Sequence, residues 1–139
     1  MRPTLVVTTT LTLLALMVVP AASFGRSASW QAFHTPSGHI VCDYFHPRLR
    51  CDIEGPTYRQ PKKNCHGIGD FGFSFALLTT GGRGHGICVS DAVEPSKHVL
   101  HYGKRWSRGG ITCVSRTTGL TCRKGKHFMF LSRQKYKVG

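Results

Sequence analysis

Residues 109–122 read GGITCVSRTTGLTC, and this stretch decides the fold because Cys113 and Cys122 flank a turn-forming segment, residues 116–119. A segment of this kind folds back into an antiparallel hairpin with a four-residue loop, which places the two cysteines opposite each other. Directly opposed residues can lie at the Cα separation of about 5.5 Å that suits a disulfide. The stretch therefore predicts a β-hairpin braced by a disulfide between Cys113 and Cys122.

A second stretch repeats this pattern 71 residues earlier. Residues 38–51 read GHIVCDYFHPRLRC, in which Cys42 and Cys51 flank the turn-forming residues 45–48. Two copies do not make a repeat array, so we interpret the similarity as a pseudo-repeat within one domain. The chain has six cysteines, and in an oxidising compartment an even number indicates disulfides. The predicted connectivity is Cys42–Cys51, Cys65–Cys88 and Cys113–Cys122.

Short β-like runs make up much of the remaining chain. In Phe71–Leu77 the large apolar residues occupy every second position, as on one face of a strand. Phenylalanines beside cations can stack on bases or sugars, but we expect burial instead, because a small domain needs large side chains in its core. The predicted core phenylalanines are Phe71, Phe73, Phe75, Phe128 and Phe130. The other predicted strands are Ile40–Cys42, Ile87–Val89, Val99–Tyr102, Ile111–Val114 and Phe128–Leu131.

The fold class follows from these patterns. No segment after residue 23 shows a sustained helical period, and glycine is frequent. Thr35–Gly38 has Pro at its second and Gly at its fourth position, as a β-turn prefers. We predict an all-β fold, a small disulfide-stapled sandwich or barrel of short antiparallel strands and hairpins, with one modest core.

The first 23 residues have the features of a secretory signal peptide. Met1 and Arg2 form a positive start, residues 5–19 are mainly apolar, and Pro20–Ser23 supplies the small residues that precede cleavage. The apolar run is shorter than the ~20 residues that span a bilayer, and Pro20 ends it, which disfavours a membrane anchor. We predict a signal peptide at 1–23 and a single secreted β domain at 24–139, extracellular or in the cell envelope.

The charge distribution is the clearest functional signal. The chain has 19 Lys and Arg against 6 Asp and Glu, and no carboxylate side chain follows Glu94. Such one-sided charge creates a positive surface that attracts anions and weakens with salt. We predict contact with an anionic polymer or membrane surface through Arg105, Arg108, Arg123, Lys124, Lys126, Arg133, Lys135 and Lys137.

Eight histidines raise the possibility of acid–base chemistry. A secreted ribonuclease needs two histidines around a phosphate and a lysine, and His127 beside Lys126 is the best candidate for such a pair. No local spacing fixes a second histidine, so the sequence assigns no catalytic residue. The predicted disulfides leave no free thiol, and Gly-x-Ser-x-Gly is absent.

Metal binding is also disfavoured by spacing. Zinc fingers and ribbons use cysteine pairs two to four residues apart, whereas the close pairs here have eight residues between them. His98 and His101 would share a face on a helix, but on a strand they point to opposite faces. We therefore expect no dedicated metal and no nucleotide cofactor, and the sequence leaves the oligomeric state open.

The chain resembles a family of small secreted actinobacterial proteins of unknown function. The matching segments, in order, are Phe33–Gly38 leading to Cys42, Cys51–Ile53, Cys88–Asp91, Leu100–Gly103, Gly110–Cys113 with Ser115, Gly119–Cys122 and His127–Arg133. The family usually has asparagine, proline and glycine where this chain has His39, His101 and Lys126. The resemblance implies export and a six-cysteine scaffold, and it carries over no catalytic residue and no ligand.

These observations predict a non-enzymatic binding module for anionic envelope polymers or surfaces. Two alternatives stay open. The first is a small secreted hydrolase, nuclease-like, that uses histidine acid–base chemistry. The second is a secreted inhibitor or effector that recognises one protein partner, a role for which rigid disulfide-braced loops are suited.

Overall fold

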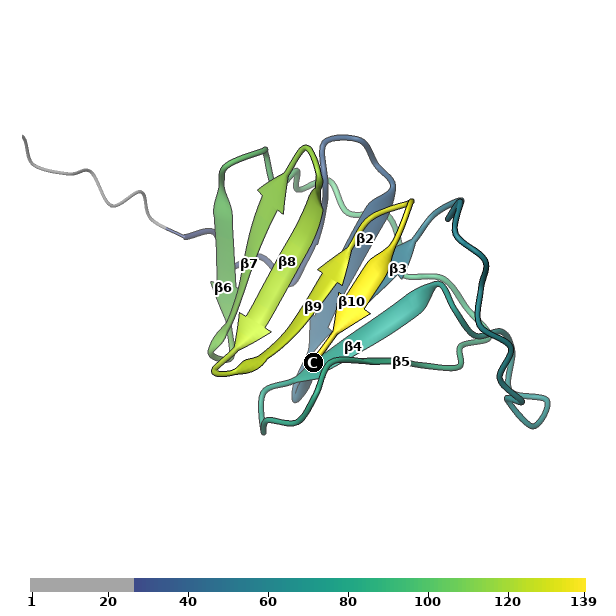
Figure 1. Ribbon diagram of the computed structural model, residues 1–139. Coiled ribbons are helices and arrows are strands. Elements are labelled where there is room, and N and C mark those ends of the chain that lie inside the picture. The colour runs from purple at the N-terminus through teal and green to yellow at the C-terminus, as the bar shows by residue number, and fades with distance from the viewer. Residues whose placement is uncertain (1–26) are drawn as a thin grey trace, which may run out of the picture.

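The computed structural model describes residues 27–139 as two antiparallel five-stranded sheets, with no helix in that range (Figure 1). The N-terminal sheet contains β1 (Ala32–His34), β2 (Ile40–Phe45), β3 (Arg48–Ile53), β4 (Ser74–Leu78) and β5 (His85–Gly86). The C-terminal sheet contains β6 (Arg105–Arg108), β7 (Ile111–Arg116), β8 (Gly119–Lys124), β9 (His127–Leu131) and β10 (Tyr136–Val138). The prediction of a small disulfide-stapled all-β fold is confirmed.

The two sheets have the same topology, because each is a meander in which neighbouring strands follow one another along the chain. The registers also match. One row across the N-terminal sheet reads Phe33–Cys42–Cys51–Phe75, and the corresponding row across the C-terminal sheet reads Trp106–Cys113–Cys122–Met129. The similarity seen in the sequence around the cysteines therefore extends, at the level of structure, over two five-stranded units.

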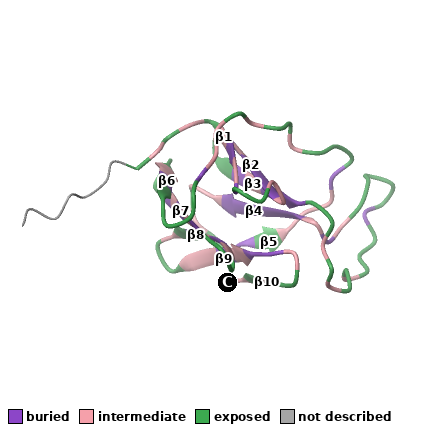
Figure 2. Cartoon of the chain, turned by 90° about the horizontal axis from the view of Figure 1, so that it is seen from above, coloured by how far each residue is buried: buried purple, intermediate pink, exposed green. Residues whose placement is uncertain are grey.

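The core lies between the facing surfaces of the two sheets. Phe33 and Trp106, which occupy the same place in the two rows, pack against each other with ring centroids 5.1 Å apart. The residues that precede β1 close one side of the core. Ala28 pairs with Trp106, and the Trp106 Nε1 donates a hydrogen bond to the Trp30 carbonyl at 2.8 Å. Figure 2 shows the sheets as two layers with most of β2, β3 and β4 buried.

The disulfides join Cys42 to Cys51, Cys65 to Cys88 and Cys113 to Cys122, as the spacing predicts. Both hairpin disulfides lie in the core, and all four of their cysteines are fully buried. The paired residues are closer than expected, with Cα separations of 4.1 and 4.0 Å, because they occupy the narrow positions of their ladders. The loops are also shorter than predicted, since Phe45 pairs with Arg48 and Arg116 with Gly119.

Three of the predicted strands are wrong in their position or extent. Ile87–Val89 and Val99–Tyr102 form no ladder and touch their neighbours through the single bridges Val89–Asp70 and Val99–His34. The short strand expected at Ile87 lies instead at His85–Gly86. The strand predicted for Phe71–Leu77 begins only at Ser74. The turn predicted at Thr35–Gly38 is confirmed by a hydrogen bond from the Gly38 amide to the Thr35 carbonyl.

The phenylalanine core is only partly confirmed. Phe75 is buried, whereas Phe71, Phe73, Phe128 and Phe130 are partly exposed. On β9 the inward positions belong to Met129 and Leu131, because these residues pair with the inward-facing Cys122 and Leu120 of β8. Phe128 and Phe130 consequently lie on the outer face of the C-terminal sheet.

Replacing both cysteines of one hairpin by alanine should lower the free energy of unfolding by about 2.5–3 kcal/mol, the loop-closure entropy of a ten-residue ring. The two hairpins serve as matched controls, since Cys42–Cys51 and Cys113–Cys122 have the same sequence separation of 9 and are equally buried. Urea denaturation of each double variant measures the loss. A loss below about 1 kcal/mol in both would show that the cross-links do not hold the sheets in register.

Candidate functional site

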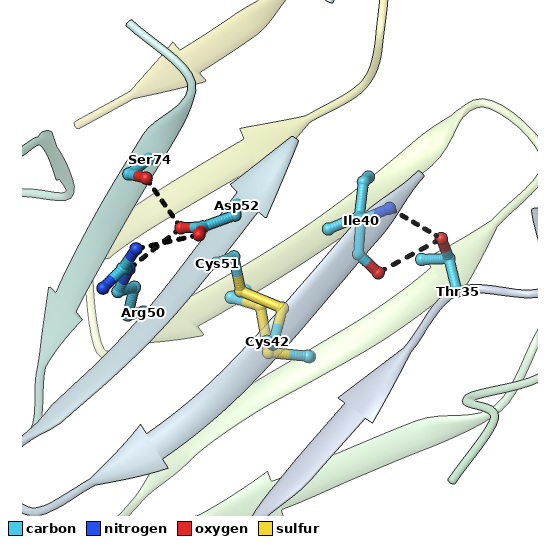
Figure 3. Close-up of a disulfide and its surroundings, with 9 residues drawn as sticks. Thr35, Ile40, Cys42, Arg50, Cys51, Asp52 and Ser74 are labelled. Atoms are coloured by element: carbon cyan, nitrogen blue, oxygen red, sulfur yellow. Dashed lines mark hydrogen bonds and ion pairs between the residues drawn. A yellow bond between two sulfur atoms is a disulfide. The ribbon is translucent and has the colours of Figure 1, made fainter. Parts of the chain in front are cut away.

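The carboxylates of the domain are gathered away from the C-terminal sheet. All six precede residue 95, and two of them bind one arginine of β3. Arg50 donates hydrogen bonds to both oxygens of Asp52 at 2.9 Å, and Asp52 also accepts from the Ser74 hydroxyl at 2.7 Å, as Figure 3 shows. A second carboxylate, Asp91, accepts from Arg50 at 3.0 Å. Negative charge is thus concentrated on the N-terminal sheet and its connections.

This network holds a segment of chain over the outer face of the N-terminal sheet. The Val93 amide donates to Asp52 at 2.8 Å, and further along the His34 amide of β1 donates to the His98 carbonyl at 2.9 Å. The outward-facing Ser74 and Ala76 of β4 are consequently fully buried. The outer face of the N-terminal sheet is therefore partly covered. The pockets that remain along it are lined by carboxylates, Asp52 and Glu54 in one and Asp43 and Glu94 in the other, which disfavours an anionic ligand there.

The outer face of the C-terminal sheet is open by contrast, and we call it the open face. One row of outward residues reads Arg105–Val114–Thr121–Phe130–Lys137 across all five strands. A neighbouring row reads Ser107–Thr112–Arg123–Phe128. All of these side chains are partly or fully exposed. The open face thus combines three cations, three hydroxyl groups and two phenylalanine rings without a carboxylate side chain.

The cations of this half of the domain are not neutralised within the protein. The ion pairs found between residues 27 and 139 both involve Arg50. Arg123 lies over the ring of Phe128, with its guanidinium carbon 5.2 Å from the ring centroid. This contact orients the arginine along the sheet and leaves its charge uncompensated.

The structure divides the eight predicted polyanion-binding residues into three groups. Arg105, Arg123 and Lys137 lie on the open face. At one end of the sandwich the Lys124 ammonium donates to the Gly109 carbonyl, Arg108 lies over the Tyr44 ring, and Lys126 follows Lys124 in the turn. Arg133 and Lys135 belong to the β9–β10 turn at the opposite end. The basic residues therefore do not form one continuous patch.

A pocket of about 180 Å³ lies at the end of the sandwich that contains the β9–β10 turn. It is lined by the β1–β2, β7–β8 and β9–β10 turns, and among its lining residues are His39, Arg116 and Arg133. The sequence singled out Arg133 but gave no reason to place it beside Arg116 or His39. Three turns far apart in the chain, together with Tyr102 from the connection before β6, form this pocket, and only the folded arrangement of the two sheets brings them together.

The side-chain contacts of the histidines within residues 27–139 involve backbone carbonyls, a tyrosine hydroxyl and an aromatic ring. His127 begins β9 and pairs across the ladder with Lys124, while Lys126 is exposed in the turn. His98 stacks on Trp30 with ring centroids 4.6 Å apart, and His46 hydrogen-bonds the Tyr44 hydroxyl at 3.3 Å. Among residues 27–139 no three His, Cys, Asp or Glu side chains gather in a group that could hold a metal ion.

Comparisons with protein-family models, with curated proteins and with solved structures find no match for this chain. The resemblance to small secreted actinobacterial proteins therefore stays a prediction.

The predicted signal peptide at 1–23 lies outside the described residues. Residues 27–139 contain no helix with the length and apolar character of a membrane span. The three disulfides are typical of an oxidising, extracellular environment.

The contact between Arg50 and Asp91 should make stability depend on pH. Hydrogen bonding to Arg50, and then its positive charge, lower the pKa of Asp91 below its ordinary value. A carboxyl group whose pKa is lowered by folding stabilises the fold above its unfolded pKa, and this contribution disappears as the pH falls through the folded pKa. Asp91→Asn should therefore be less stable than the parent above about pH 5, with the difference shrinking in acid.

Because Asp91 is exposed, the expected difference is small. Chemical denaturation between neutral and acidic pH measures it. Glu94→Gln is the matched control, since Glu94 is a nearby exposed carboxylate with no ion pair in the described part of the chain. An Asp91→Asn difference that stayed constant through the acid range would contradict the assigned contact.

Proposed function

We propose that the open face of the C-terminal sheet binds an anionic polymer of the cell envelope or the extracellular space. The observation that carries the proposal is the pair of residue rows on this face, which align Arg105, Arg123 and Lys137 with Phe128 and Phe130. No carboxylate side chain lies in the five strands that form the face.

The spacing of the charges favours a polymer over a single small anion. Arg105 and Lys137 lie on the two outer strands of the sheet, and neighbouring strands are separated by about 4.8 Å, so the row extends over roughly 19 Å. An isolated phosphate contacts only one of these cations at a time. A chain with repeated negative charges contacts all three and releases several counterions on binding.

The aromatic rings indicate what lies between the charges of the ligand. Phe128 and Phe130 are two residues apart on β9 and point to the same side. These partly exposed rings, one of them with the Arg123 guanidinium over it, can offer stacking contacts to bases or to the apolar faces of sugars. The hydroxyl groups of Ser107, Thr112 and Thr121 on the same face supply neutral hydrogen-bonding groups. We therefore favour a phosphorylated or sulfated polymer that contains rings.

Salt should weaken binding less strongly after the face cations are removed. For a single-stranded polyanion the slope of log K against log[salt] is about −0.7 per neutralised phosphate, so Arg105→Gln/Arg123→Gln/Lys137→Gln should reduce it by about 2. The control Arg59→Gln/Lys62→Gln/Lys97→Gln removes the same charge from exposed positions outside the C-terminal sheet. Fluorescence anisotropy with labelled oligo-dT and with heparin measures both slopes.

Equal slopes for the two triple variants would reject the open face as the contact surface. Unchanged binding of the parent protein between low and high salt would reject polyanion binding altogether. Degradation of RNA or DNA during the same incubations, across pH 5–8, would favour the nuclease alternative over a binding module.

Removing the rings should have a different signature from removing the charges. Phe128→Leu/Phe130→Leu should weaken binding of oligo-dT by about 1 kcal/mol or more per ring, because stacking on a base contributes about that much. The salt slope should stay unchanged, since no cation is lost. Phe71→Leu is a control, as a partly exposed phenylalanine outside the C-terminal sheet. Parent-like affinity in the double variant would show that the rings do not contact the ligand.

A further inference from the structure

The pocket at the end of the sandwich, which we call the end pocket, lies where both sheets contribute turns. Its lining residues include Thr35, Ser37 and His39 from the β1–β2 turn of the N-terminal sheet. Arg116 and Thr118 come from the β7–β8 turn, and Arg133 comes from the β9–β10 turn of the C-terminal sheet. Each sheet therefore supplies hydrogen-bonding and basic groups to one small space.

The turn from the N-terminal sheet is held rigidly. The Thr35 side chain is buried, and its hydroxyl oxygen lies 3.3 Å from the Ile40 amide that donates to it, as Figure 3 shows. The Gly38 amide donates to the Thr35 carbonyl at 2.9 Å, and Gly38 has a φ of 74°, a conformation that favours glycine. Ser37 and His39 therefore extend from a fixed backbone.

The two arginines are free to bind an anion. Arg133 is anchored by its Nε, which donates to the Gly55 carbonyl at 2.9 Å. Its terminal amino groups have no carboxylate partner among residues 27–139, and Arg116 is likewise unpaired within that range. No carboxylate lines the pocket. Arg133 is thus oriented without being neutralised, which is the arrangement that favours binding of an oxyanion.

The volume limits the size of the ligand. Pockets for drug-sized molecules are about 300–1,000 Å³, whereas this one is about 180 Å³. A single tetrahedral oxyanion fits, and the Thr118 hydroxyl can add to the hydrogen bonds that two guanidinium groups begin. The Ser37 hydroxyl lies at the same pocket, where it accepts from the His39 amide at 3.4 Å and lies 3.3 Å from the Thr35 hydroxyl.

We propose that the end pocket binds one phosphate or sulfate group, either free or as the substituent of a larger molecule. The site is distinct from the open face and does not depend on polymer binding there. It lies next to that face, however, because the ring of Phe130 packs against Gly119, which lines the pocket. A polymer on the open face can therefore place a pendant or terminal phosphate group in the end pocket.

Titration with defined anions, followed by amide NMR shifts, tests this proposal. Inorganic phosphate and sulfate should shift and saturate the resonances of residues 35–39, 116–119 and 132–134, and acetate should bind more weakly because it is not tetrahedral. Glycerol 3-phosphate distinguishes a free phosphate ion from a phosphate group that is the substituent of a larger molecule. Binding as tight as that of inorganic phosphate indicates an esterified group as the ligand, and weaker binding indicates the free ion.

Arg116→Gln should weaken phosphate binding about tenfold or more, since a hydrogen bond to a charged group is lost. Arg116 is exposed and makes no hydrogen bond through its side chain within residues 27–139, so the variant should fold normally. Arg133→Lys tests the second guanidinium and keeps the charge, and it should also weaken binding.

Arg59→Gln/Lys97→Gln, at exposed positions outside both the open face and the end pocket, is the matched control and should leave phosphate binding unchanged. Shifts that do not saturate, or that spread evenly over all basic residues, would overturn the proposal. Equal loss in the control and in Arg116→Gln would do the same. Because this titration uses only small anions, a negative result would overturn the end-pocket proposal alone. Polymer binding on the open face is tested separately by its salt dependence.

Discussion

The disulfides Cys42–Cys51 and Cys113–Cys122 fix the arrangement on which the rest of this structure depends. Each joins directly opposed residues at the centre of a hairpin, and both lie inside the core. A slip of one residue in either ladder would turn every inward side chain outward, so the covalent bond determines which residues face the core. In the C-terminal sheet it places Leu120 inward and Thr121 and Arg123 outward.

This constraint explains how a small domain tolerates so much uncompensated charge. The covalent bonds brace each sheet from within, and the packed rings of the core hold the two sheets together. The ion pairs within residues 27–139 are confined to Arg50. The carboxylates bound to Arg50 hold chain over the outer face of the N-terminal sheet. One sheet is thus covered and contains the acidic groups, while the other is open and basic.

The cysteine spacing sufficed to predict both hairpins and their disulfides, because a hairpin is a local structure. The all-β fold followed from the short β-like runs and the absence of a helical period. The side on which Phe128 and Phe130 lie could not be predicted from periodicity, since Phe128–Leu131 is apolar at every position. The pairing of Met129 with Cys122 determines the side on which the two rings lie, and the turn at Gly125 sets this register. Strands β1 and β6 were missed because they are short and partly polar. The end pocket was missed because three distant turns form it.

Gly119 shows how closely the two proposed sites are connected. It pairs with Arg116 at the start of β8, has a φ of 145°, and lines the end pocket. A Cβ at this position would lie 2.9 Å from the ring of Phe130 and would also meet the Leu131 carbonyl. Only glycine lets the ring of the open face and the wall of the pocket approach this closely. The same residue therefore shapes the rim of the pocket and supports one ring of the face.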